Sequence, residues 1–402
     1  MRVLLLHNYY QQAGGEDAVF AGEAALLSEW GHEVVTYQRS NSEITGNGLI
    51  GTGLRTTWST RSYREVEELL RKVKPSVAHF HNTFPLISPA AYYACAEVGV
   101  PAVQTLHNYR LLCPTATLFR GGKVCEQCLG KGIPWTGVVH ACYRGSAAAS
   151  GTAAAMLAFH RALGTWKKKV TTYIALSEFA RSKFIEGGLP ADRILVKPNF
   201  TVDDSVLKTW PGEFALFVGR LSEEKGVLSL LAAWRLLQKS VPLKIVGDGP
   251  QMETLARIAR DSSVRSTELT GRLGKKEIRI LMSSARFLVF PSIWYEGFPM
   301  VIVEAFAAGL PIIASRIGSL AEIVRDRVTG LHFNPGDASD LADKVQWAWT
   351  HPEEMTLMGQ RARAEYEDKY TPRANYRMLM GVYEVAIAKG VQTRIYARSI
   401  AG

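Results

Sequence analysis

The chain has 402 residues, a formal net charge of +10 and an apolar content of 47%. This length exceeds what one hydrophobic core usually organises, so we expect two domains of roughly 200 residues each. No run approaches the roughly 18 uncharged apolar residues of a transmembrane helix. The opening apolar run, Met1–Leu6, is too short for a secretory signal and indicates a buried strand. We therefore expect a soluble or peripheral protein of the cytoplasm.

The first half alternates short apolar runs with helix-prone stretches. Continuous apolar strands between amphipathic helices are typical of a parallel sheet covered on both faces. The expected strands are Val3–Leu6, Glu33–Tyr37, Val77–Phe80, Ala102–Leu106, Tyr173–Leu176 and Ile194–Val196. We predict a doubly wound α/β domain over residues 1–203.

Several polar or small residues follow these strands. Ligands of open parallel sheets bind beyond the carboxyl ends of the strands. Gly14 and Gly15 follow the first strand and precede a helix, so the backbone there can approach a bound group closely. His79, His81 and His107 lie at or just past strand ends. Each is either a partner for a sugar hydroxyl or a satisfied polar residue of the sheet, and we choose His107 as the functional one.

Four of the five cysteines cluster in the sequence. One Cys-x-x-Cys pair flanked by two more distant thiols is compatible with a tetrahedral structural zinc. The alternative is four free thiols in a reducing compartment. The candidate zinc ligands are Cys113, Cys125, Cys128 and Cys142.

The stretch from Gln127 to Ser177 contains no acidic residue. Its central part, Ser146–Trp166, is Ala-rich and helix-prone. One interpretation is a basic, partly apolar helix that rests on an anionic membrane. The other is a core-facing helix with a solvated basic end. The basic residues are not interleaved with base-stacking aromatics in a recognised module, so we expect no nucleic-acid partner. The basic side chains are Lys131, Arg144, Arg161, Lys167, Lys168 and Lys169.

Periodicity stops between Phe200 and Glu213, which predicts a linker, and a second alternation follows. Its expected strands are Ala215–Val218, Leu243–Val246, Glu268–Leu269, Phe287–Phe290, Pro311–Ala314 and Leu331–Phe333. We predict a second doubly wound domain over residues 204–375, which gives an α/β protein whose two Rossmann-like domains face a central cleft.

The second domain opens with two cations. Arg220 ends the first strand and Lys225 begins the next helix, so both reach one point above the sheet. Two desolvated cations need an anion between them, and a diphosphate with growing negative charge fits. For an isolated pair, ordinary surface charge is the alternative. Gly219 and Gly247 lie in strand-to-helix turns where small residues permit close approach.

The segment Glu296–Glu304 carries the most specific signal. Glu296 lies in a loop after a strand, Pro299 suits the first helical turn, and Glu304 lies about one turn inside the helix. Free N–H groups at a helix start suit a phosphate, and a carboxylate one turn further can accept hydrogen bonds from a ribose diol. Gly297 and Phe298 complete the loop. The segment predicts a pocket for a nucleoside diphosphate that carries a sugar.

Six sequence elements, and their order along the chain, resemble those of the retaining glycosyltransferases of the group 1 family, which adopt the GT-B fold. The family resemblance implies that the last helix, about 376–395, packs back onto the first domain. The elements are Gly14-Gly15, Thr105-Leu-His107, Val218-Gly-Arg220 with Lys225-Gly226, Val246-Gly-Asp-Gly-Pro250, Glu296-Gly-Phe-Pro299 with Glu304, and Gly309-Leu-Pro-Ile-Ile-Ala-Ser315.

The resemblance also implies roles. Arg220 and Lys225 would bind the diphosphate, Glu304 the ribose, and Glu296 with the backbone after it the donor sugar. Gly15 would let the first-domain loop approach the phosphates, and His107 would contact the donor sugar near the reacting carbon. No catalytic metal is implied. The donor is a nucleotide sugar.

A retaining glycosidase uses two carboxylates across the scissile bond. We expect no comparable carboxylate on the first-domain side, which favours front-face attack with a phosphate oxygen accepting the acceptor proton. The acceptor is a carbohydrate or a lipid-linked glycan, as in bacterial surface polysaccharide or glycolipid assembly at the inner membrane face. The alternatives are a non-catalytic scaffold of the same fold, and an epimerase or phosphorylase on a similar frame.

Overall fold

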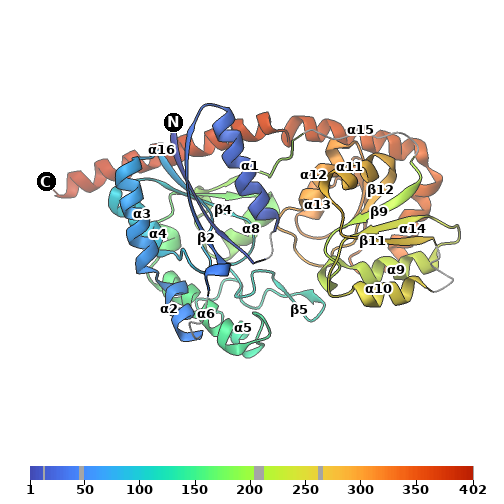
Figure 1. Ribbon diagram of the computed structural model, residues 1–402, viewed down its shortest axis with the longest axis horizontal. Helices are drawn as coiled ribbons and strands as arrows, with labels where there is room; N and C mark the ends of the chain where they lie inside the picture. The colour runs from blue at the N-terminus through green and yellow to red at the C-terminus, as the bar shows by residue number, and fades with distance from the viewer. Residues whose placement is uncertain (12–13, 45–48, 203–211, 261–265, 402) are drawn as a thin grey trace. The chain divides into compact units, whose positions relative to one another are not determined.

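A computed structural model describes residues 1–11, 14–44, 49–202, 212–260 and 266–401 (Figure 1). The chain forms two compact units. Unit 1 comprises Met1–Leu118, Cys125–Pro198 and Asn375–Gly402. Unit 2 comprises Phe119–Val124 and Asn199–Ala374.

Unit 1 is a six-stranded sheet in the order β2-β1-β3-β4-β7-β8, and every pairing is parallel. All six strands expected in the first half are present. Strands are β1 (Arg2–Tyr9), β2 (Glu33–Ser40), β3 (Val77–Asn82), β4 (Ala102–Leu106), β7 (Thr172–Ala175) and β8 (Ile194–Val196). Helices are α1 (Gly15–Glu29), α2 (Leu49–Thr57), α3 (Thr60–Val73), α4 (Ala90–Val98), α5 (Trp135–Val139), α6 (Ala147–Ala162), α7 (Thr165–Lys168) and α8 (Glu178–Glu186).

The last helix, α16 (Pro372–Ala401), belongs to unit 1 from Asn375 onwards and packs against it. Its Tyr376 ring stacks on Trp30 with centroids 4.1 Å apart, and its hydroxyl lies 2.8 Å from His32 Nε2. Tyr383, about two helical turns after Tyr376, is fully buried. Its hydroxyl lies 2.9 Å from Nδ1 of His79 on β3. These aromatic contacts join the end of the chain to its beginning.

Unit 2 is a second six-stranded parallel sheet, in the order β11-β10-β9-β12-β13-β14. The six strands expected in the second half are all present, so the α/β prediction is confirmed in both units. Strands are β9 (Phe214–Val218), β10 (Leu243–Val246), β11 (Thr267–Gly271), β12 (Ala285–Phe290), β13 (Ile312–Ser315) and β14 (Gly330–Phe333). Helices are α9 (Val227–Leu236), α10 (Met252–Ala259), α11 (Lys275–Ser284), α12 (Met300–Ala307), α13 (Leu320–Ile323), α14 (Ala338–Thr350) and α15 (Pro352–Lys369).

The central strand β9 shows why these runs become strands. Its side chains alternate between two apolar clusters, Ala215 and Phe217 in one and Phe214 and Leu216 in the other. A strand buried on both faces must be apolar at every position, and helices cover both faces. This arrangement leaves the loops beyond the strand ends as the places for polar function.

Two parts of the chain differ from expectation or escape it. A small antiparallel hairpin, β5 (Phe119–Arg120) and β6 (Lys123–Val124), was not predicted, because two-residue strands carry no periodicity. Most of the expected linker, 203–211, lies outside the described residues. Among the helices that the structure describes, none is long and apolar enough to cross a membrane.

Candidate functional site

The order of the strands in unit 2 reverses between β9 and β12, which are neighbours in the sheet. The chain leaves β9 towards β10 on one side and leaves β12 towards β13 on the other. Loops diverge at such a switch point and open a crevice, which is where parallel sheets bind ligands. The loop after β9 carries Arg220 and Lys225, and the loop after β12 carries Glu296. The sequence-predicted cations and carboxylate thus meet at one edge of the sheet.

Lys225 and Glu296 are in direct contact. Lys225 Nζ lies 2.7 Å from Glu296 Oε1, and Ser292 Oγ donates a hydrogen bond of 2.5 Å to the same oxygen. The ammonium also lies 5.4 Å from the ring centroid of Phe290 and 5.7 Å from that of Trp294. Glu296 is buried. A charge-assisted hydrogen bond in a partly desolvated position is strong, so these two side chains are held in place.

Backbone contacts fix the two loops against each other. The Ser319 hydroxyl donates to the Glu296 carbonyl at 2.8 Å, and the amide of Ile293 donates to the Glu224 carbonyl at 2.9 Å. Gly226 has φ +68°, and a Cβ there would lie 1.9 Å from the carbonyl oxygen of Pro291. Only glycine fits this position, because both the conformation and the space exclude a side chain.

The remaining residues of unit 2 predicted for the site lie in the loops after β9, β10 and β12 and in α12. Arg220 is exposed two residues beyond β9, and Lys225 closes a short 3-10 turn before α9. Pro299 caps α12, and Glu304 is partly buried one turn inside that helix. A Cβ on Gly247 would lie 1.8 Å from the Gly219 carbonyl, so the turns after β9 and β10 touch through their backbones. Gly297 and Phe298 are half-buried in the loop between Glu296 and the helix.

In unit 1, the turn after β1 is organised by Asp17. Gly14 precedes α1, and its amide donates to Asp17 Oδ2 at 2.7 Å, while Gly15 is the first residue of the helix. The other carboxylate oxygen of Asp17 lies 2.7 Å from His7 Nε2. Burial lowers the pKa of His7 to about 4, against the opposing effect of Asp17. His7 is therefore neutral at pH 7 and donates to Asp17 through Nε2.

His107 stands at the end of a chain of polar side chains that runs into the core of unit 1. Its Nε2 lies 3.0 Å from Nδ1 of His81, and the two rings stack. His81 Nε2 lies 3.4 Å from Glu23 Oε2, and Glu23 Oε1 accepts a hydrogen bond of 2.7 Å from Lys197 Nζ. Burial lowers the pKa of His107 well below its ordinary value. These side-chain contacts fix the orientation of the His107 ring, which is half-buried.

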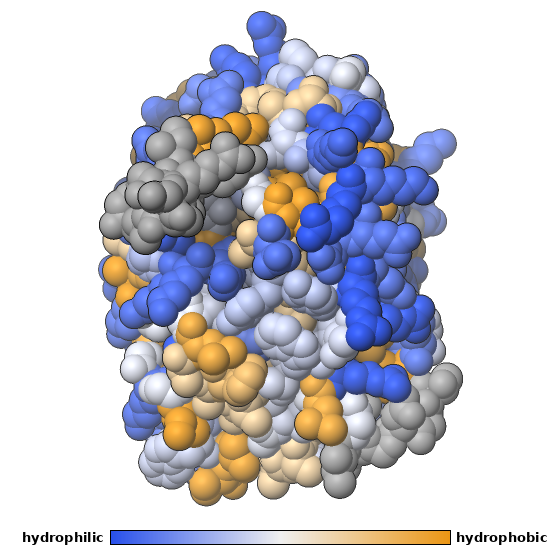
Figure 2. All heavy atoms as spheres, turned by 90° about the vertical axis from the view of Figure 1, so that its left-hand side faces the viewer, coloured by the Kyte–Doolittle hydropathy of each residue, from blue (hydrophilic) through white to orange (hydrophobic). Residues whose placement is uncertain are grey.

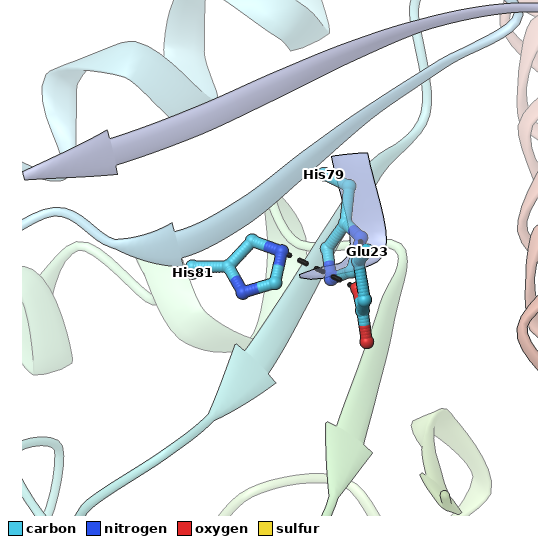
Figure 3. Close-up of side chains that lie close together, drawn as sticks. All are labelled: Glu23, His79 and His81. Atoms are coloured by element: carbon cyan, nitrogen blue, oxygen red, sulfur yellow. Dashed lines mark ion pairs between the residues drawn. The ribbon is translucent and has the colours of Figure 1, made fainter. Parts of the chain in front are cut away.

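Glu23, His79 and His81 offer three ligand atoms within 4.8 Å of one another (Figure 3). Burial opposes ionisation of Glu23, but Lys197 and the two histidines outweigh it and hold the pKa of this carboxyl well below its usual range. Both nitrogens of His79 already have partners, the Tyr383 hydroxyl at 2.9 Å and Thr105 Oγ1 at 2.7 Å. An ammonium beside the carboxylate repels a cation. The cluster is a buried polar network held by Lys197, and His79, whose two nitrogens both have partners, is a polar residue of the core.

The comparisons with known proteins agree with this architecture. The family described as glycosyl transferases group 1 matches residues 204–365, and the glycosyl transferase 4-like domain matches residues 14–199. The chain belongs to the group 1 glycosyltransferases. A crystal structure of Anabaena Alr3699/HepE in complex with UDP has a TM-score of 0.68 at 16% identity and covers 96% of this chain and 100% of its own. The apo lipopolysaccharide outer core galactosyltransferase WaaB has a TM-score of 0.65 at 15% identity over 98% of this chain and 100% of its own. This group 1 glycosyltransferase thus has the GT-B fold.

Curated relatives are similar over a shorter span. The glycogen synthase of Mycobacterium tuberculosis is 39% identical over 161 residues, which are 39% of this chain and 38% of the relative. The D-rhamnosyltransferase WbpZ of Pseudomonas aeruginosa is 31% identical over 160 residues, 39% of this chain and 42% of the relative. The matches thus span about two fifths of these relatives. Glycosyl transfer is the activity that the family and these relatives share.

The zinc prediction for the four cysteines of this glycosyltransferase finds no support. Among the described residues, which include all four, only Glu23, His79 and His81 bring three candidate ligand atoms together. The sulfur of Cys128 instead lies 3.0 Å from Thr136 Oγ1, and burial raises the pKa of Cys113. None of the four forms a disulfide. Closeness in sequence therefore did not bring three of the sulfurs together.

The expectation that the first-domain side holds no carboxylate comparable to a glycosidase nucleophile stays a prediction, but one buried acid of unit 1 was not singled out from the sequence. Glu16, in the first turn of α1, lies at the carboxyl-terminal edge of the unit 1 sheet, where Asn108 Nδ2 donates to its Oε2 at 3.3 Å. Its Oε1 is buried and has no hydrogen-bond partner among the described residues. Burial, followed by the charge of Asp17, raises the pKa of Glu16 to about 8, against the effects of Tyr10 and Arg110. An acidic residue at a helix start usually complements the helix dipole, which hid this one in the sequence.

Proposed function

We propose that this enzyme transfers a sugar from a nucleoside-diphosphate sugar to a carbohydrate or lipid-linked acceptor, with retention of the anomeric configuration. The observation that carries the proposal is the convergence of Lys225, Glu296 and the start of α12 at the switch point of unit 2. Cations and a helix amino end suit a diphosphate. Carboxylates beside them suit sugar and ribose hydroxyls. The HepE neighbour was solved with UDP and with UDP-glucose, which supports this class of donor.

In this proposal Arg220, Lys225 and the amino end of α12 stabilise the charge that accumulates on the leaving diphosphate. Glu304 accepts hydrogen bonds from the ribose. Glu296 and the backbone of Gly297–Pro299 hold the sugar hydroxyls. Gly219 and Gly247 keep side chains away from the nucleotide. The leaving group departs and the acceptor attacks on the same face of the sugar, with a phosphate oxygen taking the acceptor proton.

For unit 1 we propose that His107 contacts the donor sugar near the reacting carbon and that Gly14 and Gly15 let the loop approach the phosphates. The neutral state of His107, which burial favours, makes its ring a hydrogen-bonding group rather than a charge. Glu16, protonated at neutral pH by its raised pKa, would donate a hydrogen bond to an acceptor oxygen through Oε1, the carboxyl oxygen that Asn108 does not bind. No metal is required for these steps.

The biological setting is part of the proposal. An O-antigen chain mannosyltransferase of Escherichia coli, 29% identical over 160 residues, and the lipopolysaccharide outer core galactosyltransferase WaaB are named for such polymers and support a role in polysaccharide or glycolipid assembly. A lipid-linked acceptor would lie at a membrane surface, so we propose a peripheral position at the inner face of the plasma membrane.

Thermal unfolding measured with uridine, guanosine, adenosine and thymidine diphosphates and their sugars tests the proposal. A ligand that binds only the folded state raises apparent stability. We expect the nucleotides of one base to raise the melting temperature. Lys225→Ala and Glu304→Ala should each weaken the binding of that nucleotide by about 10- to 100-fold, which corresponds to the loss of one charge-assisted hydrogen bond. Lys275→Ala, an exposed lysine of the same unit, is the control. Full binding by both site variants would refute the assignment, and NMR of the anomeric proton of the product decides retention.

A further inference from the structure

Helix α6 has an unusual solvent-facing side. Its exposed residues include Ala148, Ala155, Phe159 and Ala162, which lie along one stripe of the helix, while its other side is buried in unit 1. The one charged side chain of the helix, Arg161, donates instead to the carbonyls of Leu111 and Lys131. A surface helix normally presents polar residues to water, and a helix that is apolar all round is normally covered.

The neighbours of α6 extend this apolar surface. Helix α5 packs beside it through Val138 and Gly151, and α2 packs beside it through Gly53 and Thr152. Large hydrophobic side chains are exposed across the three helices and the adjoining turns. They are Leu54 (69% exposed), Ile133 (63%), Trp135 (55%), Val139 (68%), Phe159 (44%) and Leu163 (45%). Figure 2 shows hydrophobic side chains gathered at the lower end of the face where Figure 1 places α2 and α6.

Basic residues border this surface, and the stretch of chain that forms most of it contains no acidic residue; Glu186, which lies beside Gly130, belongs to another segment. Residues 127–177 contain no Asp or Glu, and Lys131, Lys167 and Lys168 are exposed. Lys131 Nζ lies 5.6 Å from the ring centroid of Trp135, so cation and indole stand side by side. Lys131, Lys167 and Arg161 also line a cavity of about 200 Å³ together with Gly130, Gly132 and Gly164. The Arg161 guanidinium is bound to carbonyls, which leaves the two lysines to meet an anion there.

We propose that this surface docks on an anionic lipid bilayer. The docking face consists of Ile133, Trp135, Val139, Phe159 and Leu163 with Lys131, Lys167 and Lys168. Aromatic and aliphatic side chains would enter the boundary between headgroups and acyl chains, and the lysines would bind lipid phosphates. The inference deepens the proposed function, on which it rests only for the lipid-borne acceptor.

A second copy of this chain fits the docking face less well than a bilayer. A symmetric pair places the same patch against itself, so the lysines of one copy would face those of the other. Like charges across an interface disfavour association, whereas an anionic bilayer offers the opposite charge. Charge complementarity therefore selects the membrane.

Vesicle sedimentation of the full chain tests the proposal. The vesicles are phosphatidylcholine alone or phosphatidylcholine with about one third phosphatidylglycerol. We expect at least about tenfold stronger binding to the anionic vesicles, lost in high salt. Trp135→Ser with Val139→Ser should weaken binding about tenfold or more, because two exposed apolar groups no longer insert. Lys168→Ala should weaken it about fivefold.

Matched controls lie elsewhere on unit 1. Val385→Ser on α16 and Lys72→Ala on α3 replace exposed residues of the same types and should bind vesicles like the parent. Equal binding to both vesicle types, or unchanged binding of the docking-face variants, overturns the proposal. A dimer in light scattering that the Trp135 and Val139 changes dissolve, without vesicle binding, would assign the face to a second copy instead. Melting-temperature shifts with nucleotide on the same preparations keep this result separate from the proposed function, since docking-face variants should retain them.

Discussion

Replacing Glu16 by glutamine tests the buried acid beside the Gly14–Gly15 turn. The carboxyl has a pKa raised from 4.5 to about 8, mainly by burial. The folded state therefore binds a proton that the unfolded state has released between these two values. Stability from this group is complete below pH 4.5, falls as pH rises, and is gone above about pH 8. Glutamine keeps the shape and a hydrogen-bonding group but has no proton to lose.

The size of the effect follows from the interval. Each pH unit is worth about 1.4 kcal/mol, so the interval sets an upper limit of about 5 kcal/mol. Partial solvent access of a half-buried side chain reduces this, and we expect about 2 kcal/mol. Urea unfolding of parent and Glu16→Gln at pH 4.5 and pH 8.5 measures it. The two proteins should be similarly stable at the lower pH, and the variant should be more stable at the higher one. A stability difference that does not change with pH would refute the raised pKa, and Glu33→Gln, an exposed acid of the same unit, gives the baseline.

Three further outcomes follow from packing and chemistry. Lys197→Met leaves Glu23 buried without its ammonium partner, so the free energy of unfolding in urea should fall by about 3–5 kcal/mol. Adding Glu23→Gln should restore most of this stability. A loss below about 1 kcal/mol would contradict the buried pair. Gly226→Ala should lower the free energy of unfolding by about 3 kcal/mol or more and weaken nucleotide binding. Gly271→Ala, at a glycine with a similar positive φ but open space around it, should lower it by only about 1 kcal/mol. Equal losses would mean that the Pro291 contact is unimportant. EDTA treatment should leave the melting temperature unchanged, because the cysteine sulfurs do not converge, and a drop of several degrees would revive a structural metal.

The fold was predictable because its signal is local. A strand buried on both faces must be apolar throughout, so runs such as Val3–Leu6 and Phe287–Phe290 predict strands whatever their neighbours in the sheet are. The glycine at 226 and the helix start at Met300 are also local, since each follows from turn and capping chemistry. These features placed Lys225 and Glu296 at the same edge before any coordinates were known.

The polar interior was less predictable because it depends on which strands pair. His81 on β3 and His107 after β4 touch only because these strands are neighbours, and Glu23 reaches them from α1. No spacing in the sequence encodes that meeting. The same reason explains why the zinc prediction found no support, since a short separation of cysteines along the chain does not by itself bring their sulfurs together. Glu16 was overlooked because its burial, which raises its pKa, depends on how the chain folds around it and not on its neighbours in sequence.

The contact between Lys225 and Glu296 leads to a final prediction about how donor and product are distinguished. Each side chain is the partner of the other at 2.7 Å, so a diphosphate that binds Lys225 competes with Glu296 for the ammonium. A donor sugar compensates because its hydroxyls donate to the released carboxylate, whereas a free nucleoside diphosphate has no such group. Glu296→Ala removes both the competitor and the acceptor of those hydrogen bonds. We expect the variant to bind the nucleotide sugar about 10- to 100-fold more weakly, and the free diphosphate as well as or better than the parent. Isothermal titration with both ligands measures the two changes, and Glu277→Ala, an exposed acid of unit 2, is the control. If both ligands weakened equally, Glu296 would act on the shape of the loop through Ser292 and Ser319 rather than on the sugar.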